Sequence, residues 1–150
     1  MLEKRDDGPR QPIGYGRNRL VALHPPARAS VGKADFKKLH VWEKAHALSL
    51  TAHRVAQTIR GAEYTSLKSQ MIRSAMSIPA NLVEGRGQKT AREFSRYVRV
   101  SIGSASELEY HLITARDFGA ITHSDFLALL SQLIEVRRML YGLLHRLVAP

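Results

Sequence analysis

Four basic residues, Lys89, Arg92, Arg96 and Arg99, recur at spacings of three, four and three. On a helix this spacing places the side chains on one face. Positive charges near the start of a helix oppose its dipole and repel one another, so helix stability does not explain them. Phosphate binding does explain them. We call these four residues the basic ridge and predict that it binds nucleic acid. The alternative is a solvated face that keeps a basic protein in solution.

The overall charge favours the same class of partner. Lys and Arg total 23 against 13 Asp and Glu, which gives a formal net charge of +10 and favours polyanionic partners. Phe94 belongs to the predicted core stripe, which leaves Tyr97 as the only nearby aromatic residue, so no platform for unstacked bases is expected. The protein should therefore bind the phosphate backbone with little preference for the nucleotide sequence. The amino-acid sequence does not indicate whether the ligand is RNA or DNA.

A second distinctive segment, QMIRSAMSIPANLVEGRG, covers residues 70–87. Pro79 lies inside an otherwise helical pattern, where it removes one donor and presses on the carbonyl of Ala75, so we expect a kink. Ser77 and Asn81 flank the proline, and their side chains can bond the backbone groups that the kink leaves unpaired. The alternative is a ligand-binding role for Asn81.

Glu84 stands just before Gly85 and Gly87, two glycines expected to end this helix. A carboxylate at the C-terminus of a helix opposes the dipole and needs another reason to be there. The expected partners are Arg73, Arg86 or the first amides of the next helix. A ligand-binding or catalytic role for Glu84 is again the alternative.

Catalysis and metal binding are not expected. Cysteine is absent, which excludes disulfides, thiolate zinc sites and thiol chemistry. A di-iron bundle needs two Glu-x-x-His pairs, but Glu43 and His46 form the only such pair, and Glu107 with His111 could at most share a surface ion. No phosphate-binding loop or nucleophile motif occurs. The sequence therefore predicts a non-enzymatic protein without metal or cofactor.

Four helices must position these residues. Apolar residues recur every three or four positions over residues 39–60, 65–85, 90–118 and 122–147. Short connections make neighbouring helices antiparallel, so residues 35–150 are predicted to form an all-α, up-down-up-down four-helix bundle. The residues expected to cap or end the helices are Gly61, Thr65 or Ser66, Gly85 and Gly87, Thr90 with Glu93, Gly119, and Thr122 with Asp125.

Residues 1–34 differ in composition from the rest of the chain. They hold four of the six prolines and seven basic against three acidic residues, so we expect a disordered or loosely docked basic arm that could touch nucleic acid. A solvated leader or an over-long start site is the alternative. No apolar run approaches the ~18 residues of a membrane span, and no apolar signal core opens the chain, so a cytoplasmic protein without a membrane partner is expected.

The predicted topology gathers charge at one end of the bundle. The starts of the first and third helices meet the ends of the second and fourth there, and eight basic residues face four acidic ones, Asp35, Glu43, Glu84 and Glu93. We predict that this end, together with Arg99, is the nucleic-acid-binding surface. The eight basic residues are Lys37, Lys38, Lys44, Arg86, Lys89, Arg92, Arg96 and Arg146.

A second apolar row occurs on three of the predicted helices. One core stripe would not need it, so we expect copies of the bundle to pack against one another; a wide core stripe within one chain is the alternative. The residues of this row are Ile72, Met76 and Val83; Tyr97 and Ile113; Leu130, Ile134 and Leu144.

The order of several motifs resembles the four-helix bundle family encoded within intervening sequences of bacterial 23S rRNA genes. The motifs are DFKKLHVWEKA with Trp42, the segment 70–87, Phe94 and GSASELEYHL at 103–112, and the match covers about residues 35–148. The resemblance implies a homo-oligomer, a pentameric ring in known members, with RNA or DNA as the usual proposed ligand. It also implies an alternative role as the accessory subunit of a reverse transcriptase, as in diversity-generating retroelements. It supplies no catalytic residue.

Overall fold

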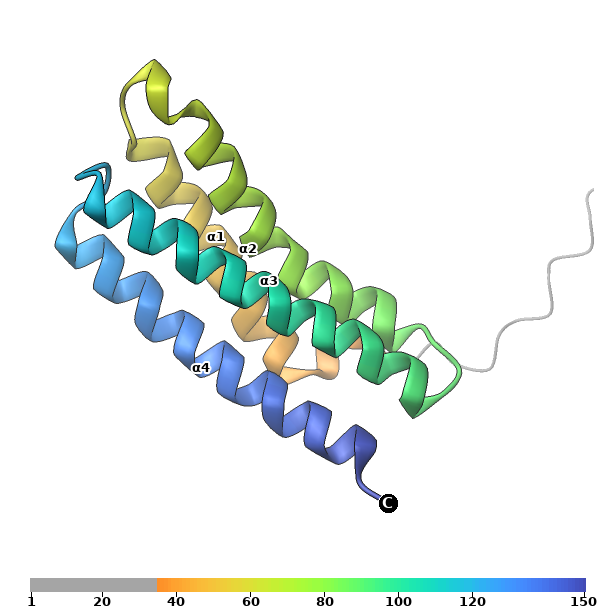
Figure 1. Ribbon diagram of the computed structural model, residues 1–150. Coiled ribbons are helices and arrows are strands. Elements are labelled where there is room, and N and C mark those ends of the chain that lie inside the picture. The colour runs from red at the N-terminus through yellow and green to blue at the C-terminus, as the bar shows by residue number, and fades with distance from the viewer. Residues whose placement is uncertain (1–34) are drawn as a thin grey trace, which may run out of the picture. The chain divides into compact units, whose positions relative to one another are not determined.

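The computed structural model describes residues 35–150; the predicted basic arm, residues 1–34, lies outside them. Its elements are η1 (Phe36–Lys38), α1 (His40–Thr58), η2 (Ala62–Tyr64), α2 (Thr65–Arg86), α3 (Ala91–Asp117) and α4 (His123–Val148). Each helix runs antiparallel to the next, and α1 also packs against α4, which closes the bundle (Figure 1). The predicted up-down-up-down four-helix bundle is confirmed.

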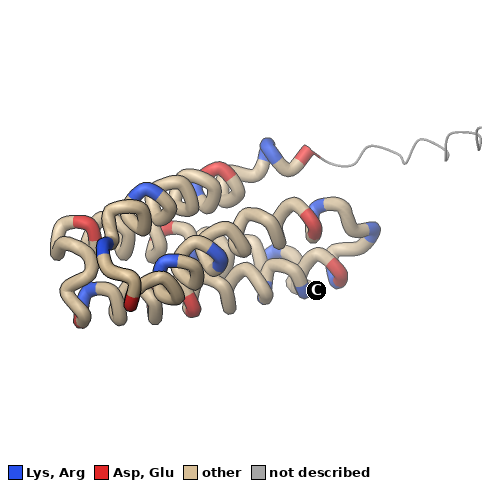
Figure 2. Tube along the Cα trace, turned by 90° about the horizontal axis from the view of Figure 1, so that it is seen from above, with Lys and Arg blue, Asp and Glu red and all other residues tan. Residues whose placement is uncertain are grey.

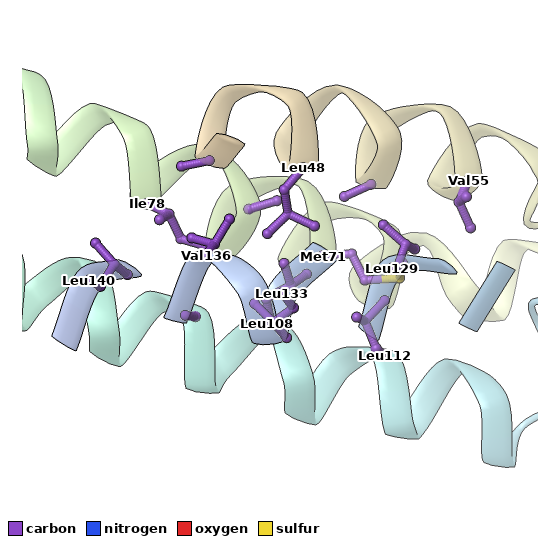
Figure 3. Packing of buried hydrophobic residues seen from close by; sticks show 14 of the residues in the cluster. Leu48, Val55, Met71, Ile78, Leu108, Leu112, Leu129, Leu133, Val136 and Leu140 are labelled. Atoms are coloured by element: carbon purple, nitrogen blue, oxygen red, sulfur yellow. The ribbon is translucent and has the colours of Figure 1, made fainter. Parts of the chain in front are cut away.

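The core follows the apolar periodicity of all four helices. Leu48 of α1, Met71 and Ile78 of α2, Leu108 of α3 and Leu133 of α4 are fully buried and point into the space between the helices (Figure 3). Each such side chain stabilises the fold by about 1.5–3 kcal/mol relative to an exposed one. The apolar spacing thus determines which face of each helix turns outward and carries charge.

Three predicted helix ends are confirmed. The Thr90 side chain accepts from the Glu93 amide while the Glu93 carboxylate accepts from the Thr90 amide, a capping box that starts α3. Thr122 caps α4 by accepting from the Asp125 amide at 3.0 Å. Gly119 follows α3 with φ +66°, a left-handed conformation that glycine adopts without strain.

Other helix ends differ from the prediction. Neither Thr65 nor Ser66 caps α2, because the Thr65 hydroxyl donates to the Ala62 carbonyl of the preceding turn at 2.9 Å. Gly61 lies beyond the end of α1, whose C-cap is Ile59. Gly85 does not end α2; it is buried inside the helix, which continues to Arg86. Gly87 is the C-cap of α2, as expected.

The buried position of Gly85 reflects the close approach of α2 to α3. A Cβ atom built on Gly85 would lie 2.6 Å from the Phe94 ring and 2.7 Å from Cβ of Tyr97. Hydroxyl groups join the same two helices farther along: Ser104 of α3 donates to the Ser77 hydroxyl at 2.8 Å, and buried Ser101 donates to the Ile78 carbonyl at 2.9 Å. These contacts fix the position of α3, and therefore of the basic ridge.

Pro79 is buried, and α2 runs through it without a break (Figure 1). The Asn81 amide donates to the carbonyl of Ser77 at 2.8 Å and to its hydroxyl at 3.0 Å. The prediction that Asn81 bonds the backbone group freed by Pro79 is wrong, because the carbonyl it bonds is that of Ser77 and not that of Ala75, which loses its donor to the proline. Asn81 and Ser77 belong to the polar contacts between α2 and α3.

Candidate nucleic-acid interface

The starts of α1 and α3 and the ends of α2 and α4 lie at one end of the bundle (Figure 1). We call it the basic end, and Figure 2 shows that residues of both charge signs occur there. Arg92, Arg96 and Arg99 are exposed on α3, and none of them forms an ion pair with another residue of 35–150. Lys89 is also exposed, but it lies in the turn before α3 and not on the helix.

The acidic residues of the basic end do not neutralise the ridge. The Glu93 carboxylate lies 3.1 Å from the Thr90 amide and 3.0 Å from its hydroxyl, so the capping box occupies it. Asp35 accepts from the Lys37 amide at 3.0 Å and caps η1. Glu43 lies beside His40, with 3.9 Å between Oε2 and Nδ1. These carboxylates are engaged in local contacts, which leaves the ridge cations free.

The remaining predicted basic residues fall into two groups. Lys37 and Lys38 are exposed in η1, at the basic end. Lys44 faces α4, because its Nζ lies 3.2 Å from Oε1 of Glu135 on that helix. Its pairing with α4 was not predicted, since sequence periodicity does not show which residues of two distant helices face each other.

The two halves of α3 carry opposite charge. Arg92, Arg96 and Arg99 lie in its first half, whereas Glu107, Glu109 and Asp117 lie in its second half beside a single basic residue, Arg116. Glu93 in the first turn and Arg116 in the last turn follow the order that the helix dipole favours, but the majority charge of each half is the reverse of that order. Helix stability therefore does not account for the excess of arginines in the first half of α3.

A hollow of about 430 Å³ opens between η1 and the end of α2. Phe36, Val83, Glu84 and Arg86 contribute to its walls. Within residues 35–150, Glu84 forms no ion pair with Arg73 or with Arg86, contrary to prediction. The buried Nε of Arg86 has no hydrogen-bond partner there either. The Glu84 carboxylate is thus available to a ligand or to solvent, whereas Asp35 of the same hollow is engaged as the cap of η1.

Three aromatic rings that the sequence analysis did not place near the ridge lie at the start of the chain's first helices, and one of them, Phe36, lines this hollow. The Phe36 ring meets Trp42 edge-on at 4.9 Å, and Trp42 stacks on His46 at 5.2 Å and 6°. Sequence reasoning missed them because about fifty residues separate Phe36 from the ridge. The available signal was that Phe36, Trp42 and His46 lie close together in the sequence, around the start of the first predicted helix.

A second surface is apolar and lies on α4. Leu127, Ile134, Tyr141 and Val148 recur every seven residues, and each is about half exposed. We call these four residues the α4 row. Only Ile134 had been predicted; the seven-residue spacing was the signal for the others.

The other members of the predicted apolar row divide between surface and interior. Met76, Val83 and Ile113 are exposed, whereas Ile72 and Tyr97 are half-buried. Leu130 and Leu144 pack against the core, so for these two residues the wide core stripe is the correct interpretation.

Two further properties of residues 35–150 concern metal binding and membranes. No group of three His, Asp or Glu residues in 35–150 converges as metal ligands would, and Nε2 of His111 lies 3.6 Å from Oε1 of Glu107. Within the same residues, no helix is both long enough and apolar enough to span a membrane.

Comparisons with known proteins agree with this fold. The chain is similar to a crystal structure of a protein of unknown function from the S23 ribosomal protein family of Bacteroides thetaiotaomicron, with a TM-score of 0.65 and 19% identity over 69% of this chain and 97% of that one. No curated protein matches the chain in sequence. Residues 37–142 match the family described as 23S rRNA-intervening sequence protein. The chain therefore belongs to the 23S rRNA-intervening sequence protein family.

Proposed function

We propose that this protein is a non-enzymatic, homo-oligomeric nucleic-acid-binding bundle that holds phosphate groups at its basic end. One observation carries the proposal: Arg92, Arg96 and Arg99 are exposed and unpaired within 35–150, on the half of α3 where the dipole disfavours cations. An anionic ligand would remove both the mutual repulsion and the opposition to the dipole. The family's association with 23S rRNA genes favours RNA over DNA as the ligand.

A salt titration of binding to labelled single-stranded RNA tests this proposal. The slope of log affinity against log salt is about −0.7 per phosphate contact on single strands, so binding must weaken steeply as salt rises. Changing Arg92 and Arg96 together to Gln should flatten the slope by about one to two units and weaken binding equally for unrelated sequences. A slope unchanged in this variant would mean that the ridge is a solvated face.

A matched control removes the same charge far from the basic end. Arg54 and Arg60 are exposed near the end of α1, at the opposite end of the bundle. Changing both to Gln lowers the net charge by the same two units, so the slope should stay near that of the wild type. Equal flattening in both variants would show that only net charge matters and would contradict a site at the basic end.

The α4 row supports the oligomeric part of the proposal. Four half-exposed apolar side chains at seven-residue spacing form a strip that a second helix could cover. Light scattering should give a multiple of the 16.8 kDa chain mass, five by resemblance to the family. Changing Ile134 and Tyr141 to Lys should reduce the assembly to monomers, and a wild-type monomer would contradict self-association.

The same surface favours a second candidate function. If the wild-type chain is monomeric, the α4 row is suited to another protein, and the bundle would act as an adaptor, for example of a reverse transcriptase. Co-purification that depends on Ile134 and Tyr141, without dependence on Arg92 and Arg96, would favour the adaptor role over nucleic-acid binding.

A further inference from the structure

Phosphate binding does not explain the hollow between η1 and the end of α2. Its volume of about 430 Å³ lies in the ~300–1,000 Å³ range of small-molecule sites. Its lining includes the carboxylates of Asp35 and Glu84, which would repel a phosphate. We propose that this hollow binds one unstacked guanine base of a single-stranded RNA held along the basic ridge, an inference that rests on the proposed function.

Position favours a base from the same strand. Glu84 and Arg86 lie in the last turn of α2, and the following turn, residues 87–90, leads directly to α3 and contains Lys89. A strand whose phosphates lie along Arg92 and Arg96 therefore passes the mouth of the hollow. RNA recognition commonly uses this arrangement, with a backbone held by cations and one base turned out of the stack.

The walls suit the two faces of a base. Phe36 is half-buried and supplies an aromatic surface, and its ring is fixed edge-on by Trp42 at 4.9 Å. Val83, which is 38% exposed, adds an apolar wall. Stacking of one base on an aromatic side chain is worth about a 5- to 150-fold change in affinity. This contribution tolerates any base, so base preference must come from the polar groups.

The polar groups match the edge of guanine. This edge presents an acceptor oxygen followed by two adjacent donors, the ring N–H and the exocyclic amine. A carboxylate accepts two hydrogen bonds side by side, as Glu84 could from the two donors, and the Arg86 guanidinium can donate to the oxygen. Both side chains line the hollow, and neither forms an ion pair within residues 35–150. Uracil, with one donor between two acceptors, pairs poorly with a carboxylate.

The chain contains its own reporter for this site. Trp42 is the single tryptophan of the sequence, and it contacts Phe36. Full-length protein is titrated with GMP, AMP and UMP, and with uridine oligonucleotides that carry one central guanine, inosine, adenine or uracil. We expect Trp42 emission to change most with guanine. Inosine lacks the exocyclic amine and should bind between guanine and uracil.

Glu84→Gln gives the sharpest variant test. If Glu84 acted only through its charge, its replacement would tighten the binding of every oligonucleotide. The proposal predicts instead that the ratio of guanine to uracil affinity falls toward one. Glu63→Gln removes the same charge from exposed η2, outside the hollow, and should leave the ratio unchanged. The ratio does not depend on the folded fraction, so reduced stability of a variant cannot mimic the result.

A second pair of variants tests the stacking surface. Phe36→Leu should weaken guanine binding by several-fold or more, whereas Phe36→Tyr should retain it, because a phenol ring still stacks. Equal loss in both variants would contradict stacking on this ring.

The outcomes separate this inference from the proposed function. Salt-dependent RNA binding with no guanine preference and no change in Trp42 emission overturns the guanine site and leaves the basic ridge intact. Guanine-dependent Trp42 emission that ignores Arg92→Gln/Arg96→Gln overturns the ridge alone. If GMP binds as tightly as the guanine-containing strand, the hollow serves a free nucleotide, and the strand-bound base is overturned.

Discussion

The two ends of the bundle satisfy their polar and aromatic groups to different degrees. At the end where α1 meets α2 and α3 meets α4, which we call the paired end, the Tyr64 hydroxyl lies 3.4 Å from the Phe118 carbonyl and the two rings lie 6.1 Å apart. The Arg116 guanidinium lies 4.6 Å from the centre of the Phe126 ring and 2.8 Å from the Asp117 carboxylate. The side chains of Tyr64, Phe118, Arg116, Asp117 and Phe126 thus contact one another within the chain.

The two ends of the bundle also differ in the balance of their charged residues. The paired end carries four basic residues, Arg54, Arg60, Lys68 and Arg116, against three acidic ones, Glu63, Asp117 and Asp125, so its charge is nearly balanced. The basic end carries an excess of cations, unpaired arginines on α3, a hollow, and a buried guanidinium nitrogen without a partner among residues 35–150. Groups left unsatisfied in a stable fold are typical of sites that a ligand completes. The comparison therefore supports the proposal that the basic end binds a ligand and that the paired end does not.

The largest expected effect concerns packing beneath the basic end. Gly85→Ala should lower the free energy of unfolding by about 1–3 kcal/mol, because the new methyl group would meet the Phe94 ring at 2.6 Å. Gly103→Ala is the matched control on α3, where nothing lies within 4 Å of the new Cβ, and it should raise stability by about 0.5–1 kcal/mol. Urea denaturation measures both. Equal tolerance at the two glycines would contradict the close approach of α2 to α3.

The two threonine caps compare the ends directly. Thr90→Ala and Thr122→Ala should each lower the free energy of unfolding by about 0.5–2 kcal/mol in thermal or urea denaturation. Only Thr90→Ala should also weaken RNA binding, because it loosens Glu93 from the capping box and lets that carboxylate approach Arg96. An equal effect of both variants on RNA affinity would remove the distinction between the ends.

The smallest expected effect concerns Lys44. Exposed ion pairs contribute about 0.2–1 kcal/mol, so a double-mutant cycle on Lys44 and Glu135 should give a coupling energy in that range. Because Lys44 faces α4, Lys44→Gln should change the salt slope of RNA binding less than Arg96→Gln does. A larger change for Lys44 would extend the binding surface onto the groove between α1 and α4.

Much of this arrangement was predictable because it depends on local sequence. The three- and four-residue spacing of apolar residues determines the buried face of each helix, and the exposure of Arg92, Arg96 and Arg99 follows from it. The capping box of Thr90 and Glu93 depends on residues three apart. Such features need only helix geometry.

The features that escaped prediction depend on the register between helices. The hollow joins Phe36 to Val83, and the Ser104–Ser77 bond joins residues 27 apart, so neither follows from the periodicity of one helix. The end of α2 was misplaced at Gly85 for a related reason. Glycine often marks a helix end, but here it is required by the neighbouring Phe94 ring.

Amide hydrogen exchange of the full chain with and without single-stranded RNA tests the central claim most directly, because both ends are observed in one sample. The account predicts slower exchange over residues 86–96, which form the end of α2, the connecting turn and the first turns of α3, and unchanged exchange over residues 116–126 at the paired end. Protection at the paired end, or at neither end while RNA is bound, would contradict the assignment of binding to the basic end.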